Sequence, residues 1–405
     1  MLKTKKEHLL ETIYLLCLFE YICVSLFTIS YVAEFIDRYI NHTTLAIANN
    51  WFIAAVLVVI YLIKPHESKK DMILEIMTFV LFVIVTFTNQ NVDSVFYLNQ
   101  CTIFFVIGLF MICAPTTTFK RITATSLAAS LFIFAVNFYL SQNGYVYDLV
   151  VERFGTYAHS YGYYYYAQPS YYMLFAWLAY MYVRGKKEIG WIELTAEFGL
   201  QYLLYKVTTC RLGFLCAAGA FVLYIIIIKL KLIKLEWKIT KFGAVLGFPA
   251  FAAFTLLTGF FYSSSNFILI KFNKMINGRV LMVHEAFNRY DLNLFGRLII
   301  PHTDGVYFFL DAGYAYELFG CGIVFFIVVL AMYSYMFYYA CKTDDKPLFI
   351  WLATLMVFGI VGDVWVGISY TAIILGFFIM FKDRKNILKA DSKKSECDIP
   401  GNKKL

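Results

Sequence analysis

Long apolar runs recur along the whole chain, and short polar segments separate them. About twelve of these runs approach the roughly 20 residues that a helix needs to cross a bilayer. The runs are too long and too evenly apolar for barrel strands, so the pattern predicts an all-α, polytopic membrane protein of about 12 transmembrane helices. They lie near residues 11–34, 43–63, 72–88, 94–114, 122–140, 167–184, 189–206, 211–229, 241–262, 313–340, 347–362 and 364–382.

Composition agrees with a membrane protein. Over 405 residues the chain is 61% apolar and 20% aromatic, and its 15% of charged residues are too few to coat a soluble globule. The runs leave only connectors and two larger loops, so we expect a single integral membrane domain over residues 1–405. The first run follows Lys3, Lys5 and Lys6 without a small-residue cleavage site, which predicts an uncleaved first helix.

Lysines and arginines between the runs predict the orientation. They occupy alternate connectors, and the positive-inside rule places such connectors in the cytoplasm. Both termini fall on the same side, including a basic tail at 383–405 that suits anionic lipid. The net charge of +8 is carried almost entirely there, so it gives no reason to expect nucleic acid. The connector residues are Lys64, Lys69, Lys70, Lys120, Arg121, Arg184, Lys186, Lys187, Lys229 to Lys241, Lys342 and Lys346.

The opposite, outer face has few lysines but keeps arginines. Of the 35 Lys and Arg residues, nine fall on this face and six of the nine are Arg, whereas the other 26 include only three Arg. Arg is a rigid fork that grips phosphate bidentately, and Lys is a point charge. We therefore expect a phosphorylated substrate here; the alternative is that these side chains only anchor helix ends near lipid headgroups. The candidates are Arg153, Arg211, Arg279, Arg289 and Arg297.

Two outer segments are long enough to have a function: 141–166, and 263–312 between the ninth and tenth runs. In the second, Asn277 is in position to cap a short helix from Gly278 to about Tyr290. Apolar residues at helical spacing give this helix one apolar side, which we expect to lie on the membrane surface or on the bundle. They are Val280, Val283, Phe287 and Tyr290.

Tyrosines gather between Tyr157 and Tyr172. Their aromatic faces and hydroxyl groups suit sugar rings, although tyrosine is common at any membrane interface. Outer acids and histidines are candidates for the general base that transfer to a hydroxyl group requires. They are His284, His302, Asp304, Asp311, Glu317 and Asp363. Asp311 is the best placed, because the loop re-enters the bundle there.

The nine cysteines contain no Cys-x-x-Cys pair, and no His cluster has metal-ligand spacing. We expect neither a disulfide framework nor a zinc site. A bridge between Cys210 and Cys321, at the outer ends of two runs, stays open as an alternative.

Several segments resemble those of the Wzy-type polysaccharide polymerases and the related O-antigen ligases. The resemblance extends over residues 153 to 370. It rests on TCRLGFL at 209–215, NGRVLMVHEA at 277–286, DAGYAYELFGCGI at 311–323 and GDVW at 362–365, with a looser match in YAQPSYY at 166–172. Ala312, Gln168 and Arg297 depart from the residue types common in the family, and the ligases have His at the position of Asp311.

The resemblance implies an enzyme that joins polysaccharide repeat units at the outer face of the bacterial cytoplasmic membrane. A growing chain would move from undecaprenyl pyrophosphate to another lipid-linked unit, without nucleotide sugar, cofactor or metal. Arg211 and Arg279 would bind the pyrophosphates, with Arg153 or Arg289 assisting and Asp311 as base. The other candidate contacts with sugar or pyrophosphate are Gln168, His284, Arg297, His302 and Tyr314. The implied partners are the lipid-linked oligosaccharide, membrane lipids and, for this family, a chain-length regulator protein.

Other activities stay open. An O-antigen ligase-like transferase would share the fold and the arginines. A lipid-linked oligosaccharide flippase or another twelve-helix transporter would also bind phosphate through Arg, but transporters place charge near mid-membrane and often have paired broken helices. The arginines gather at one rim instead, which favours chemistry at the surface. A receptor or a purely structural role is the least expected.

Overall fold

The computed structural model describes residues 4–65, 68–88, 95–153, 155–185, 187–299, 302–303, 306–308, 310–363 and 366–383. Seven helices among them are long and apolar enough to cross a membrane. These are α1 (Lys5–Thr28), α3 (His42–Ile63), α4 (Lys69–Thr88), α6 (Phe119–Gln142), α9 (Arg211–Tyr224) with its π-helical continuation η2 (Ile225–Lys229), α10 (Lys238–Phe260) and α14 (Ile323–Thr343). The fold is thus that of a helical, multi-pass membrane protein.

Four further helices coincide with predicted apolar runs. They are α5 (Val95–Cys113), α7 (Gln168–Arg184), α8 (Trp191–Thr208) and α15 (Lys346–Phe358). Two predicted runs are not single helices. The run at 313–340 divides into α13 (Gly313–Tyr316), the π-helical η3 (Glu317–Cys321) and α14, and the run at 364–382 becomes helical only from the 3-10 turn η4 (Ala372–Gly376) onward. The count of twelve spanning helices stays a prediction.

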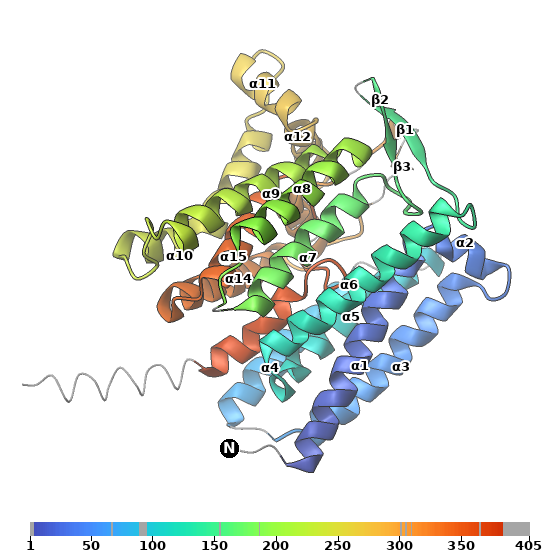
Figure 1. Ribbon diagram of the computed structural model, residues 1–405, viewed down its shortest axis with the longest axis vertical. Helices are drawn as coiled ribbons and strands as arrows, with labels where there is room; N and C mark the ends of the chain where they lie inside the picture. Colours follow the sequence, from blue (N-terminus) through green and yellow to red (C-terminus); the bar gives the residue numbers. More distant parts are fainter. Residues whose placement is uncertain are drawn as a thin grey trace, which may run out of the picture.

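The helices form one bundle with two different ends (Figure 1). The short helices α2 (Val32–Asp37), α11 (Phe267–Met275) and α12 (Arg279–Arg289) gather at one end, with the hairpin of β1 (Val150–Arg153) and β2 (Thr156–His159). We call this the loop end. The start of α1 and the connector from α3 to α4 lie at the opposite end, which we call the basic end.

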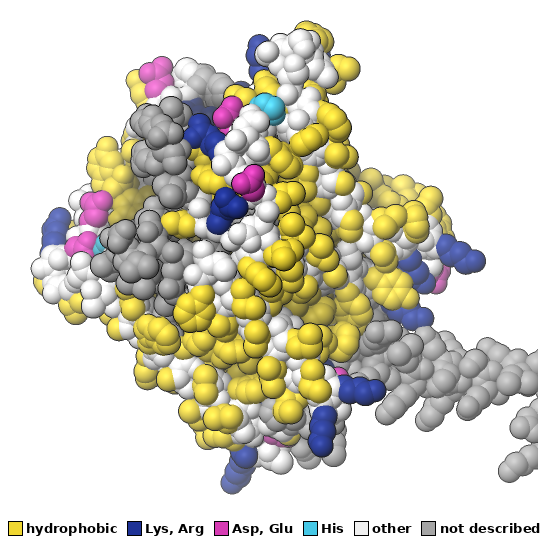
Figure 2. Space-filling view, turned by 180° about the vertical axis from the view of Figure 1, so that it is seen from behind, with side chains coloured by type: hydrophobic (Ala, Val, Ile, Leu, Met, Phe, Trp, Pro, Cys, Tyr) yellow, Lys and Arg dark blue, Asp and Glu magenta, His cyan; other side chains and the backbone are white. Residues whose placement is uncertain are grey.

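The surface between the two ends is apolar. Figure 2 shows a broad area of hydrophobic side chains, with Lys and Arg mainly along its lower and right margins. Leu62, Phe242 and Leu257 are among the large apolar side chains that the spanning helices expose. An exposed apolar area this extensive suits lipid rather than water.

A buried ionic cluster joins distant helices at the basic end. Glu75, in the second turn of α4, is 1% exposed and lies between two lysines. Lys64 Nζ, at the end of α3, is 2.9 Å from Glu75 Oε2, and Lys382 Nζ is 3.3 Å from Glu75 Oε1. Lys64 also donates a hydrogen bond to the carbonyl of Ile112 in α5. One carboxylate is therefore the shared counter-charge of two cations that are both largely buried.

Replacing this carboxylate should destabilise the protein strongly. In Glu75→Gln two buried ammonium groups lose their counter-charge, and breaking a buried ion pair costs about 3 kcal/mol or more. We expect a clearly lower unfolding temperature in detergent. Glu236→Gln, at an exposed position in the connector before α10, is the control and should change little. Equal stability of the two variants would show that the cluster does not stabilise the fold.

The second outer loop returns into the bundle at the break before α14. Its residues 293–297 run across the junction of η3 and α14, where Gly322 has φ of +91°. Gly296 lies against it so closely that a Cβ on Gly322 would be 2.2 Å from Gly296 N. The crossing segment supplies partners to helix-terminal groups that would otherwise lack them. The hydrogen bonds run from Arg297 N to Gly320 O at 2.9 Å, from Ile323 N to Asn293 O at 2.9 Å and from Val324 N to Leu294 O at 3.1 Å.

Candidate functional site

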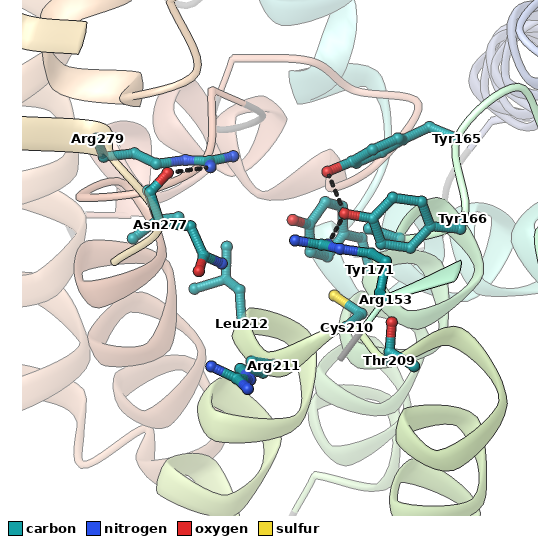
Figure 3. A pocket seen from close by; sticks show the side chains of 12 residues that line it. Arg153, Tyr165, Tyr166, Tyr171, Thr209, Cys210, Arg211, Leu212, Asn277 and Arg279 are labelled. Carbon is teal, nitrogen blue, oxygen red and sulfur yellow. Dashed lines mark hydrogen bonds between the residues drawn. The ribbon is translucent and has the colours of Figure 1, made fainter. Parts of the chain in front are cut away.

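Three arginines from distant parts of the chain line one pocket at the loop end. Arg153 comes from β1, Arg211 is the first residue of α9, and Arg279 is the first residue of α12. Figure 3 shows Arg153, Tyr165 and Tyr166 on one side of the pocket and Arg279 with Asn277 on the other. The enclosed space is small, about 40 Å³. The other lining residues are Ala167, Tyr171, Thr209, Cys210, Leu212 and Val361.

The β1–β2 hairpin holds Arg153. Its strands pair antiparallel, with Arg153 opposite Thr156. The Arg153 guanidinium donates to the Tyr166 hydroxyl and lies 4.8 Å from the centre of the Tyr166 ring. At the base of the hairpin, Asp148 accepts hydrogen bonds from Ser160 N at 3.0 Å and Tyr161 N at 2.8 Å. The sequence did not indicate these strands, because the segment is short, tyrosine-rich and without clear alternation.

The turn before α9 positions Arg211. Thr209 ends α8 with φ of +51°, and the chain reverses direction within two residues. Gly213 then allows α9 to approach α7 closely, since a Cβ there would lie 2.2 Å from Ser170 Oγ. Arg211 is exposed at the N-terminus of α9, where free N–H groups and the helix dipole also favour an anion.

Arg279 begins the predicted amphipathic helix, which the structure confirms as α12. Its apolar side faces the bundle, where Val283 packs on Gly259 of α10. The predicted cap was wrong: Asn277 has φ of +54° and does not cap the helix with its side chain. Asn273 Oδ1 instead accepts the N–H of Leu281 at 3.0 Å. Asn273 belongs to the preceding helix α11, so no residue directly before α12 marks this hydrogen bond in the sequence.

Asp311 forms an ion pair with Arg279. Their side chains are 18% and 13% exposed, and Arg279 Nη2 is the donor to Asp311 Oδ2. Burial raises the pKa of Asp311, and the charge and hydrogen bond of Arg279 lower it. The same two charges act on Tyr165, whose pKa is raised first by burial and then by Asp311, with Arg279 opposing. Asp311 therefore lies next to the pocket, in contact with Arg279, although it is not one of the lining residues.

Asp363 is a second carboxylate near this pair. It follows α15, and desolvation raises its pKa, with Asp311 adding to the rise and Arg279 opposing it. Asp363 keeps exposed surface, so a proton or a substrate can reach it. The sequence marks Asp363 only as one of several outer acids. Its approach to Asp311 depends on the packing of segments 52 residues apart in the chain.

Gln168 is the other predicted residue next to the pocket. Its Oε1 accepts the N–H of Tyr165 at 3.3 Å, and its Nε2 donates to the Tyr370 hydroxyl at 3.3 Å. Tyr370 in turn stacks on Tyr172, with ring centres 4.7 Å apart. Gln168 thus supports the tyrosine side of the pocket and does not line it.

The remaining predicted residues lie elsewhere. Arg289 pairs with Glu285 at 3.4 Å. His284 Nδ1 is 3.1 Å from the carbonyl of Gly259, and the fully buried Tyr314 donates its hydroxyl to the Met356 carbonyl at 2.8 Å.

Three further candidate residues belong to the second outer loop. Arg297 belongs to the crossing segment, and its Nε is buried without a hydrogen-bond partner among the described residues. His302 lies in the short strand β3 (His302–Thr303), which pairs with β4 (Val306–Tyr307). Asp304 lies outside the described residues.

Cys210 is the one cysteine among the lining residues of the pocket. Cys210 lines it, but Cys210 and Cys321 are both free and buried, so the bridge between them that we left open is not formed. Within the described ranges no group of three or more His, Cys, Asp or Glu side chains could hold a metal ion.

Comparison with protein-family models, with curated proteins and with solved structures finds no match to this chain.

Proposed function

We propose that this protein is a membrane glycosyltransferase that polymerises undecaprenyl-pyrophosphate-linked oligosaccharide repeat units, as the Wzy-type polymerases do. The observation that carries the proposal is the meeting of Arg153, Arg211 and Arg279 at one pocket with Asp311 beside them. Three permanent cations at one small site suit a diphosphate. Tyr165 and Tyr166 add aromatic faces and hydroxyl groups of the kind that bind sugars.

The reaction needs only groups that this pocket offers. The acceptor sugar loses its hydroxyl proton to the Asp311 carboxylate, and its oxygen forms a bond to the anomeric carbon of the donor. The bond from that carbon to the pyrophosphate oxygen breaks, and its electron pair leaves with the lipid pyrophosphate. Arg211 and Arg279 stabilise the negative charge that develops there. The arginines supply this charge without a metal or another cofactor.

The proposal includes an orientation. The loop end faces the outside of a bacterial cytoplasmic membrane, and the basic end with both termini faces the cytoplasm. In the proposed arrangement of about twelve spans, the broken ones included, the pocket lies at the outer membrane surface, where a lipid pyrophosphate lies. The product is a capsular, exopolysaccharide or O-antigen type of glycan, and a chain-length regulator is a further proposed partner.

The broken helix of α13, η3 and α14 favours one alternative, a flippase or another transporter. Transporters use broken helices to bind ions at mid-membrane. In this protein the arginines lie at the ends of elements at the loop end, which favours transfer at the surface. An O-antigen ligase-like transferase would use the same groups with a different acceptor.

One assay separates these activities. Purified protein in nanodiscs is incubated with an undecaprenyl-pyrophosphate-linked repeat unit in EDTA, without nucleotide sugar. We expect a ladder of products spaced by one repeat unit, and no ladder with Arg211→Lys, which keeps the charge but loses the fork. Single transfer to an added acceptor would identify a ligase. No product with either protein would contradict the proposed reaction.

A further inference from the structure

The arginine best placed to bind phosphate is already occupied in the structure. Arg279 donates through Nη2 to Asp311 and through Nη1 to the carbonyl of Asn277 at 3.0 Å. Its Nε is buried and has no hydrogen-bond partner among the described residues. The cation proposed for the donor and the carboxylate proposed for the acceptor therefore neutralise each other.

Asp311 is held more firmly than its partner. The neighbouring Leu310 and Ala312 are 4% and 0% exposed, and the chain enters α13 immediately afterwards. Arg279 has a long side chain on the first residue of a helix at the loop end, and it can reach into the pocket or toward Asp311. The pocket now encloses only about 40 Å³, which holds a few water molecules, so a diphosphate requires some side chains to move. Arg279 is not one of the buried core residues, so we expect it, rather than Asp311, to be the side chain that moves.

We propose that the donor phosphate and Asp311 compete for Arg279, so that donor binding releases Asp311 to act as the base. This inference rests on the proposed function and adds the order of events at the same site. In the empty protein the ion pair keeps Asp311 from taking a proton. When a phosphate oxygen takes its place on Arg279, Asp311 becomes free to accept the acceptor's hydroxyl proton.

The charges around Asp311 support this exchange. Asp311 is largely buried, Arg279 is the cation that lowers its pKa, and Asp363 is a carboxylate close enough to interact with both. Once Arg279 turns to the phosphate, burial raises the proton affinity of Asp311 without an opposing cation at hydrogen-bond distance. The base is thus strengthened only when a donor is present. Tyr165, a neutral hydroxyl near both charges, does not replace the lost cation.

Substitution of an ordinary binding residue weakens ligand binding, whereas competition predicts that substitution of Asp311 strengthens it. Asp311→Asn removes Arg279's rival for the phosphate, so the variant should bind undecaprenyl pyrophosphate, used as the probe without sugar, more tightly. We expect a dissociation constant about tenfold lower than that of the wild type, which is the size of one charge-assisted hydrogen bond. Transfer of repeat units should be lost in the same variant.

Two controls show that the gain depends on Arg279. Asp363→Asn removes a nearby carboxylate that is not ion-paired with Arg279. The affinity of this variant for undecaprenyl pyrophosphate should change by less than about threefold. In the background Arg279→Gln, adding Asp311→Asn should give no gain, because no guanidinium remains to be released. Asp311→Ser repeats the test if Asp311→Asn is poorly retained in the membrane.

The outcomes are distinct. Suppose that the wild type binds undecaprenyl pyrophosphate and the Asp311 variants bind it equally well or more weakly. That result would overturn the competition and leave the proposed function standing. The competition would also be overturned if Asp311→Asn bound the probe more tightly in the Arg279→Gln background as well. If the wild type binds no undecaprenyl pyrophosphate and forms no polymer, the proposed function fails together with this inference.

Discussion

Arg279→Lys should lower repeat-unit transfer by about 100- to 1000-fold, the usual cost of removing one donor that stabilises developing charge. Lys keeps the positive charge but has no planar fork, so it cannot hold Asn277 and a phosphate oxygen at the same time as Arg279 can. Polymer formation in nanodiscs measures the loss. The amount of folded protein should stay normal, because Arg279 lies at the loop end and not in the core.

The control for this variant is on the same helix. Arg289 ends α12, pairs with Glu285 and does not line the pocket. Arg289→Lys should therefore retain at least about half of the wild-type activity, since an exposed i,i+4 ion pair contributes little. Similar losses in Arg279→Lys and Arg289→Lys would mean that charge at the loop end, rather than the pocket, determines activity.

Gly322→Ala should destabilise the protein strongly. Its φ of +91° is unfavourable for any residue with a Cβ, and that Cβ would lie 2.2 Å from Gly296 N and 2.5 Å from Phe295 C. Backbone strain and this clash together cost about 3 kcal/mol or more. We expect a low yield of folded protein and a lower unfolding temperature in detergent.

Gly144→Ala separates the cost of backbone strain from the cost of the steric clash. Gly144 also has positive φ, +71°, but no atom lies within 4 Å of the position of its Cβ. Its substitution should cost only about 1 kcal/mol, the strain alone. If both variants were equally stable, the crossing segment at 293–297 would have to be loosely packed.

The helices could be predicted from sequence because each has its own apolar run. The alternation of runs predicts that Arg153, Arg211 and Arg279 lie on the same face. It does not predict that they line one pocket, because that depends on how the helices pack. The ion pair of Arg279 with Asp311 could not be predicted in the same way, because it joins positions 32 residues apart without a local pattern.

The breaks in the helices were harder to predict for a related reason. The apolar run at 313–340 contains Glu317, Gly320 and Gly322 but no proline or polar segment that would divide it. The contact of Gly322 with Gly296, a residue outside the run, shows where the helix breaks. Likewise Tyr314, which we predicted to bind substrate, lies fully buried because its hydroxyl meets the Met356 carbonyl of another helix. The periodicity of apolar residues describes one helix at a time, whereas the helix break and the burial of Tyr314 depend on contacts between two segments.

The ionic cluster at the basic end has a consequence for biosynthesis. Lys64 and Glu75 are 11 residues apart and can pair as soon as α3 and α4 have entered the membrane. The second lysine, Lys382, is made about 300 residues later, after every other spanning helix. Until then Lys64 alone balances the charge of Glu75. The segment that carries Lys382 therefore docks on a carboxylate that α3 and α4 have already placed in the membrane.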